Sequence, residues 1–242
     1  MHQFLGSIFH IAIIDLLILI LYFFRMINIR VNYLLILNLV FLLSAFLLTF
    51  GLHMQSGSLL QWNWLGKLLS ILFGLLVILY IKKYRSELPL SQLGFTIRQS
   101  ARSVIWVSVV FGVYMAIGVF GSTLSMPKNT VETLLFQATM PGIDEELFYR
   151  GILLFLLSRG AYSKSVRFLG ARWDIACLLI IILFGLIHGL TYEKGELNLN
   201  TGYALGTAIT GTLFLWSRLI TGSLLLPVIV HNLFNVIVQF IE

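Results

Sequence analysis

The chain of 242 residues is 59% hydrophobic and only 11% charged, and its mean hydropathy is +0.96. Soluble domains carry about a quarter charged residues, so this chain lacks the charge needed to cover a water-exposed surface. The composition excludes an ordinary soluble protein and predicts an integral membrane protein.

Apolar runs recur along the whole chain, and about 20 apolar residues are enough for one helix to cross a bilayer. The runs cover residues 8–24, 33–52, 64–81, 104–122, 133–158, 174–190, 202–218 and 222–240. The alternation typical of a lipid-facing β-barrel is absent, so helices are the only spanning structure that fits. We expect an all-α bundle of about eight transmembrane helices, forming one domain over residues 1–242. The first run lacks a basic leader and contains Asp15, so we expect a retained helix rather than a signal peptide.

The net charge of +6 reports topology rather than nucleic-acid binding, because the basic residues lie in alternate loops. One set of loops carries twelve of them: Arg25, Arg30, Lys82, Lys83, Arg85, Arg98, Arg102, Arg159, Lys164, Arg167, Arg172 and Arg218. The opposite loops carry Lys128 and Lys194, and Lys67 lies just inside a span. The positive-inside rule then predicts that both termini lie outside the cytoplasm.

Small and aromatic residues indicate how the helices pack. Gly185 and Gly189, and likewise Gly202 and Gly206, form small-xxx-small pairs that let helix backbones approach closely in lipid. Trp62 and Trp64 are expected in an interfacial aromatic belt.

The fifth run contains the acidic sequence Asp144-Glu145-Glu146, followed by Arg150. Each charge near the centre of a membrane helix costs roughly 2.5–3.5 kcal/mol, so these groups must face protein or water and find partners. Glu146 and Arg150 are four residues apart and can form an ion pair on one face. The side chain of Glu145 points about 100° around the helix axis from that of Glu146, so it can face a different cavity. A structural charge cluster without chemistry is the alternative interpretation.

Two later runs add His188 and then the pair His231 and Asn235, which share a helix face because they are four residues apart. Asn232 lies off that face and is expected to pack or to bond backbone groups. A lone histidine in an apolar helix is usually a core residue whose hydrogen bonds are made locally. A glutamate and two polar helix faces in the same bundle, however, can act as hydrogen-bond partners for one another.

These residue types suit amide hydrolysis. A glutamate and a histidine that share a water can act as a general base, and a histidine with an asparagine can donate hydrogen bonds to an oxyanion. The only cysteine, Cys177, has no identifiable base partner, which disfavours nucleophilic catalysis. Zinc bound by Glu145, His188 and His231 is the alternative, although the His-Glu-x-x-His signature is absent. We favour the version without a metal or other cofactor.

The three motifs, Glu145-Glu146-x-x-x-Arg150, Phe184-x-x-x-His188 and His231-x-x-x-Asn235, resemble those of the CPBP/Abi family. That family includes the type II CAAX prenyl endopeptidases and bacteriocin-immunity proteins, and the resemblance covers roughly residues 90–240. It implies an eight-helix bundle in which Glu145 and His188 activate water. His231 and Asn235 would form the oxyanion hole, with Glu146 and Arg150 in support. Members are described both as metalloproteases and as glutamate-dependent enzymes.

The resulting expectation is an intramembrane endopeptidase of the bacterial plasma membrane that acts on a membrane-associated peptide or protein, with a role in bacteriocin immunity or peptide maturation. No nucleic-acid partner is expected, and no dedicated protein partner is indicated. The alternatives are a non-catalytic membrane immunity or scaffold protein and a small transporter. The absence of an internal repeat argues against the transporter.

Overall fold

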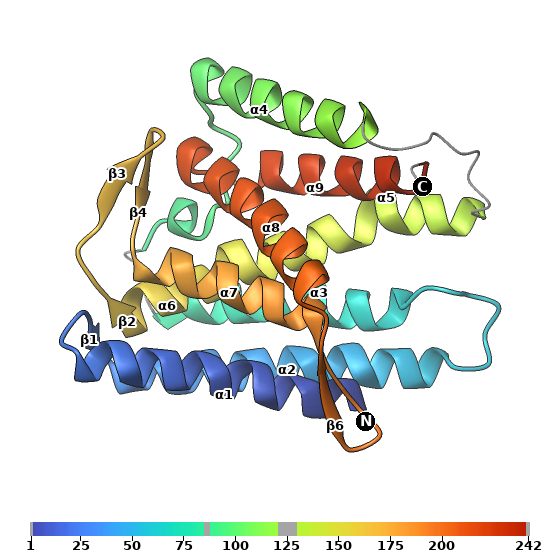
Figure 1. Cartoon of the computed structure of the whole chain (residues 1–242), viewed down its shortest axis with the longest axis horizontal. Helices are drawn as coiled ribbons and strands as arrows, with labels where there is room; N and C mark the ends of the chain where they lie inside the picture. Colours follow the sequence, from blue (N-terminus) through green and yellow to red (C-terminus); the bar gives the residue numbers. More distant parts are fainter. Residues whose placement is uncertain (1, 85–87, 121–129, 241–242) are drawn as a thin grey trace.

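The computed structural model describes residues 2–84, 88–120 and 130–240, and these form a bundle of helices (Figure 1). In chain order the α-helices are α1 (His2–Phe23), α2 (Val31–Gln55), α3 (Trp64–Tyr84), α4 (Ala101–Phe120), α5 (Val131–Glu145), α6 (Leu154–Gly160), α7 (Ile175–Gly189), α8 (Thr201–Thr221) and α9 (Leu225–Val238). A π-helix, η2 (Glu146–Leu153), joins α5 to α6 without a break. Counting α5, η2 and α6 as one segment, the described residues contain eight long helical segments, which confirms the predicted all-α bundle.

Four of the helices, α1 to α4, are long and apolar enough to cross a membrane on their own. Helices α7 and α9 are shorter but also apolar. Large apolar side chains such as Leu19, Leu76 and Ile117 are more than half exposed on the outside of the bundle. A protein in water rarely exposes so many large apolar side chains, whereas the hydrocarbon of a bilayer solvates them. The chain is a multi-pass membrane protein.

Three small pairs of antiparallel strands were not expected from the sequence. Strand β1 (Asn28–Ile29) pairs with β2 (Ala161–Tyr162), β3 (Val166–Phe168) with β4 (Ala171–Trp173), and β5 (Leu190–Glu193) with β6 (Glu196–Leu199). Each strand has at most four residues, too few for a readable period-two pattern. The β5–β6 turn is of the primed type, because Lys194 and Gly195 both have positive φ, at 52° and 91°.

The two ends of the bundle differ in charge. Strands β1 to β4 and the 3₁₀-helix η1 (Leu90–Leu93) gather at one end, and the N-terminus lies toward the other (Figure 1). The first end holds the loops that carry the predicted cytoplasmic set of basic residues. Arg85 of that set and Lys128 of the opposite set lie outside the described residues. The orientation of this bundle in the bilayer stays a prediction, but the separation of charge between its ends agrees with it.

Helices α7 and α8 approach closely through one of the two predicted glycine pairs. A Cβ added to Gly189 would lie 2.3 Å from Cβ of Ala204, and one added to Gly185 would lie 2.8 Å from the Ala204 carbonyl oxygen. The prediction for Gly202 and Gly206 is wrong. Both are exposed, and a Cβ on Gly206 would meet nothing within 4 Å. The small residues that α8 presents to α7 are alanines, so the sequence pattern misplaced the contact by two residues.

The start of α5 is tied to the connection between α2 and α3. Trp64 Nε1–H donates to Glu132 (3.0 Å), Trp62 Nε1–H donates to Thr133 (3.0 Å), and both rings pack on Phe136. These indoles therefore do more than the predicted interfacial anchoring, because their N–H groups hold α5 against the start of α3. That alignment brings Lys67 level with the acidic sequence.

Candidate active site

The helix that carries the acidic sequence is irregular on both sides of it. Pro141 lies inside α5, and a proline has no N–H to donate to the preceding turn. Asn232 of α9 bonds the backbone on both sides of Pro141, since its Oδ1 accepts from the N–H of Gly142 at 2.7 Å and its Nδ2 donates to the Thr139 carbonyl at 3.2 Å. Asn232 is thus a backbone-bonding residue, as expected. The π-helix then starts at Glu146, and π-helical turns are rare and common at functional sites.

Glu146, Arg150 and His231 form a fully buried group. Arg150 Nη1 lies 3.2 Å from Glu146 Oε1, which is the predicted ion pair, and the same oxygen accepts from His231 Nδ1 at 2.7 Å. The side chains of Glu146 and Arg150 are 0% exposed. The guanidinium also donates to the Gly211 carbonyl (3.1 Å) and lies 4.0 Å from the centre of the Phe184 ring. This group joins η2, α7, α8 and α9, and it fixes the His231 ring.

Glu145 points away from that group, as predicted from its place on the helix. Lys67 Nζ of α3 donates to Glu145 Oε1 at 2.9 Å and to Asp144 Oδ2 at 2.8 Å. Sequence reasoning treated Lys67 only as a charge near the end of a span and missed this role. The available signal was a lone lysine inside an apolar helix, which must find a carboxylate partner.

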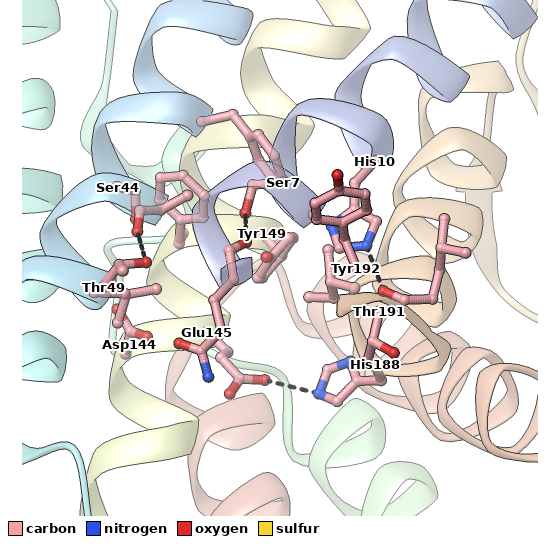
Figure 2. A pocket seen from close by; sticks show the side chains of 18 of the residues that line it. Ser7, His10, Ser44, Thr49, Asp144, Glu145, Tyr149, His188, Thr191 and Tyr192 are labelled. Carbon is pink, nitrogen blue, oxygen red and sulfur yellow. Dashed lines mark hydrogen bonds and ion pairs between the residues drawn. The ribbon is translucent and has the colours of Figure 1, made fainter. Parts of the chain in front are cut away.

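The second oxygen of Glu145 faces two histidines. Oε2 lies 3.9 Å from Nε2 of His188 and 3.9 Å from Nε2 of His231 (Figure 2 shows the first pair). This oxygen is buried and has no hydrogen-bond partner among the described residues. Each ring has its other nitrogen engaged, since His188 Nδ1 lies 2.8 Å from the Phe184 carbonyl oxygen and His231 Nδ1 lies against Glu146. A carbonyl oxygen only accepts, so Nδ1 of His188 carries the proton and its Nε2 offers a lone pair toward Glu145.

The 3.9 Å gaps have the size for one bridging water. A water at about 2.8 Å from each atom would subtend an angle of about 90°, about 20° below the tetrahedral value. A zinc ion with bonds of about 2.0–2.2 Å would need angles of about 125–155° at these spacings, all above the tetrahedral value. No group of three potential ligands with metal-site geometry occurs in the described part of the chain. The Lys67 ammonium on Glu145 adds a positive charge that disfavours a cation there. The ligand geometry of the described residues and the neighbouring Lys67 charge therefore fit a zinc ion less well than a water.

A cavity of about 350 Å³ opens beside Glu145 and His188 (Figure 2). Much of its lining comes from outside the motif helices. Helix α1 contributes Ser7 and His10, α2 contributes Ser44 and Thr49, and β5 contributes Tyr192. His10 Nε2 donates to the Leu190 carbonyl at 2.8 Å, which holds the β5–β6 hairpin against α1. The wall opposite the acidic helix is therefore built by segments in which the sequence offered no motif.

Asn235 is the one proposed site residue whose side chain forms no hydrogen bond or ion pair with the others in the described structure. It is partly exposed on α9, and its side chain makes no hydrogen bond with the described residues. Its backbone carbonyl accepts from Gln239 at 3.3 Å. Glu145, Glu146, Arg150, His188 and His231 do converge, and Lys67 joins them.

Comparison with known proteins finds a family model that matches the part of the chain that carries these residues. Residues 127–237 match the family model described as Type II CAAX prenyl endopeptidase Rce1-like. No curated protein and no solved structure matches the chain. The matched segment runs from the start of α5 to the end of α9 and contains every predicted site residue, whereas Lys67 and His10 lie outside it. The match confirms the predicted resemblance to the type II CAAX prenyl endopeptidases over residues 127–237, just under half of the chain.

Proposed function

We propose that this protein is an intramembrane endopeptidase that hydrolyses a peptide bond in a membrane-associated peptide or protein. The match of residues 127–237 to the Rce1-like family model supports CAAX-type peptidase activity in general. The observation that carries the mechanism is the unpartnered Glu145 Oε2, which faces Nε2 of both His188 and His231 at 3.9 Å inside the bundle formed by the described residues.

The first step is activation of a water held in that gap. Glu145 Oε2 accepts one hydrogen of the water, and His188 Nε2 accepts the other or holds the water's orientation. Lys67 binds Glu145 Oε1, so the carboxylate is held with Oε2 toward the water. The water oxygen then attacks the scissile carbonyl carbon, while its proton passes to the carboxylate and onward to the leaving nitrogen.

The second requirement is stabilisation of the tetrahedral oxyanion, and we assign it to His231 and Asn235. Glu146 accepts from His231 Nδ1 and so orients the ring, which directs Nε2 toward the reacting centre. When Nε2 carries a proton, it can donate to the oxyanion. Asn235 lies one helical turn further along α9 and would complete this donor pair once substrate is bound. Glu146 and Arg150 are positioning residues in this scheme.

The cavity lies at the end of the bundle away from the basic loops, because the first turns of α1 and α3 and the last turn of α7 line it. With the predicted orientation, substrate enters from the outer side of a bacterial plasma membrane. A bacteriocin or a signalling peptide precursor fits that access, and immunity or peptide maturation is the biological role we propose.

The second candidate is a non-catalytic membrane protein that binds a peptide. The cavity lined by Tyr149, Tyr192 and Phe148 would suit such binding without chemistry. The two functions differ in one respect, because a binder does not need the carboxylate of Glu145 to be charged.

Cleavage of a library of membrane-associated peptides by the purified protein tests the proposal. Glu145→Gln keeps the size of the side chain and removes the base, and we expect at least about 100-fold slower turnover. Glu193→Gln is the matched control, since Glu193 lines the same cavity, is exposed and makes no ion pair with the described residues. Unchanged cleavage by a folded Glu145→Gln variant would refute the mechanism.

Cleavage measured with and without a strong chelator distinguishes glutamate-activated water from a zinc-dependent mechanism. Turnover that survives chelation supports glutamate-activated water. Loss of turnover with restoration by zinc would assign Glu145, His188 and His231 to a metal site. If immunity or secretion in cells were unaffected by Glu145→Gln, the non-catalytic binder would replace the protease.

A further inference from the structure

A second and larger cavity, of about 870 Å³, lies on the opposite end of the bundle from the candidate active site. Helices α4 and α8 form its two side walls, and the β3–β4 hairpin closes one end. Three of the five tryptophans of the chain line it, namely Trp106, Trp173 and Trp216. None of the residues that line it belongs to the three motifs, so the proposed peptidase chemistry leaves this groove unexplained.

The groove runs from the basic end of the protein toward the apolar centre. On α4 it is lined by Ser103, Trp106 and Val110, and on α8 by Leu213, Trp216 and Ile220. Both sets have the spacing i, i+3, i+7, so each forms one continuous helix face. Seven residues of helix rise about 10 Å, so the groove extends that far along the helices from its basic end.

The basic end of the groove is a cationic and polar mouth. Arg102 at the start of α4 and Arg167 of β3 line it, together with the Ser100 and Ser103 hydroxyls. No acidic residue among those described lines the groove, and neither arginine forms an ion pair with the described residues. Two such guanidinium groups above an apolar channel are complementary to an anionic headgroup with an attached apolar chain.

The hairpin that closes the groove is held rigidly by two of the tryptophans. Trp173 Nε1 donates to the Phe168 carbonyl at 3.0 Å, and Trp216 Nε1 donates to the Leu169 carbonyl at 2.9 Å. The indole N–H groups are therefore already used, and the rings present their apolar surface. Figure 1 shows this hairpin at the end of the bundle where α4 begins and α8 ends. Hydrogen bonds thus hold the hairpin wall of the groove in place.

We propose that this groove is a binding site for one anionic phospholipid of the bilayer. The phosphodiester would lie between Arg102 and Arg167, and an acyl chain would follow the seam past Trp106 toward Val110 and Leu213. Basic pockets between transmembrane helices on the cytoplasmic side commonly bind such headgroups, because the phosphate accepts charge-assisted hydrogen bonds while the chain stays in an apolar medium. The site is independent of the proposed peptidase chemistry.

The test is titration of the detergent-solubilised protein with dioleoyl phosphatidylglycerol and, separately, with dioleoyl phosphatidylcholine. Binding is followed by native mass spectrometry and by the lipid-induced rise in Tm. We expect selective binding of phosphatidylglycerol. Arg102→Gln with Arg167→Gln should weaken it by about 30-fold, taking about fivefold for each surface cation. Lys83→Gln with Lys164→Gln is the matched control, because it removes two exposed charges at the same end but outside the groove.

Two further measurements show whether the acyl chain and the phosphate group both contribute to binding. Trp106→Ala should weaken both lipids, because it removes a wall of the apolar channel, and it leaves the cationic mouth intact. Inorganic phosphate should give no rise in Tm, since it lacks the chain. Equal affinity for the two lipids, an equal loss in the control pair, or displacement of lipid by a cleaved peptide would each overturn the assignment.

Discussion

Arg150 offers the sharpest test of how the site is held together. Its side chain is 0% exposed, pairs with Glu146 at 3.2 Å and lies over the Phe184 ring. Arg150→Met removes the charge but keeps a long apolar side chain, so Glu146 is left buried without its cation. Removal of one partner from a buried ion pair costs about 3–5 kcal/mol. We expect the variant to lose about that much free energy of unfolding.

A double-mutant cycle gives the result that would refute this reasoning. In Glu146→Gln with Arg150→Met the buried charge is gone, and the amide oxygen introduced by the first substitution can still accept from His231. The double variant should therefore be less destabilised than the sum of the two single variants by about 1–3 kcal/mol. Unfolding in mixed micelles of a denaturing and a mild detergent measures these differences. Additive effects, or an Arg150→Met cost below about 1 kcal/mol, would show that the pair does not act as a unit.

Three other changes test separate contacts. Lys67→Met should lower kcat by about 10-fold or more with little change in KM, because the Glu145 carboxylate loses the contact that orients it; peptide cleavage kinetics measure this. Asn232→Leu removes the side-chain hydrogen bonds to the Gly142 N–H and the Thr139 carbonyl and should cost about 0.5–1.5 kcal/mol for each bond; an unchanged midpoint in the same detergent titration would contradict that. Gly189→Ala brings a Cβ within 2.3 Å of Ala204 and should destabilise by about 1–3 kcal/mol, whereas Gly206→Ala meets nothing within 4 Å and should be neutral or slightly stabilising.

The fold class followed from the sequence for a simple reason. A bilayer satisfies no backbone polar groups, so long apolar runs must be helices, and their number and order can be read directly. The pairing of Glu146 with Arg150 was predictable in the same way, because both lie on one helix and local geometry relates them. The turn of Glu145 away from its neighbour followed from that geometry too.

Contacts between distant segments could not be read in this way. Lys67 lies 78 residues before Glu145, and no pattern in α3 shows which carboxylate it will meet. The helical period places Asn232 off the face of His231 and Asn235, which predicts packing or backbone bonding for it. Only the packing of α9 against the Pro141 region shows which backbone groups it bonds. The α7–α8 contact was assigned to the wrong residues of α8. Glycine and alanine both permit close approach of two helices, and the sequence does not give the rotation of each helix about its own axis.

The sequence by itself determined the membrane class, the helices and the difference in charge between the two ends, and it supplied the candidate residues for hydrolysis, because these depend on local composition and helical period. The tertiary structure decided which atoms meet: the 3.9 Å gaps between Glu145 and the two histidines, the lysine that orients the carboxylate, and the hairpins that wall the two cavities. Those features depend on the relative position and rotation of packed helices, which side-chain packing fixes and which no single segment encodes.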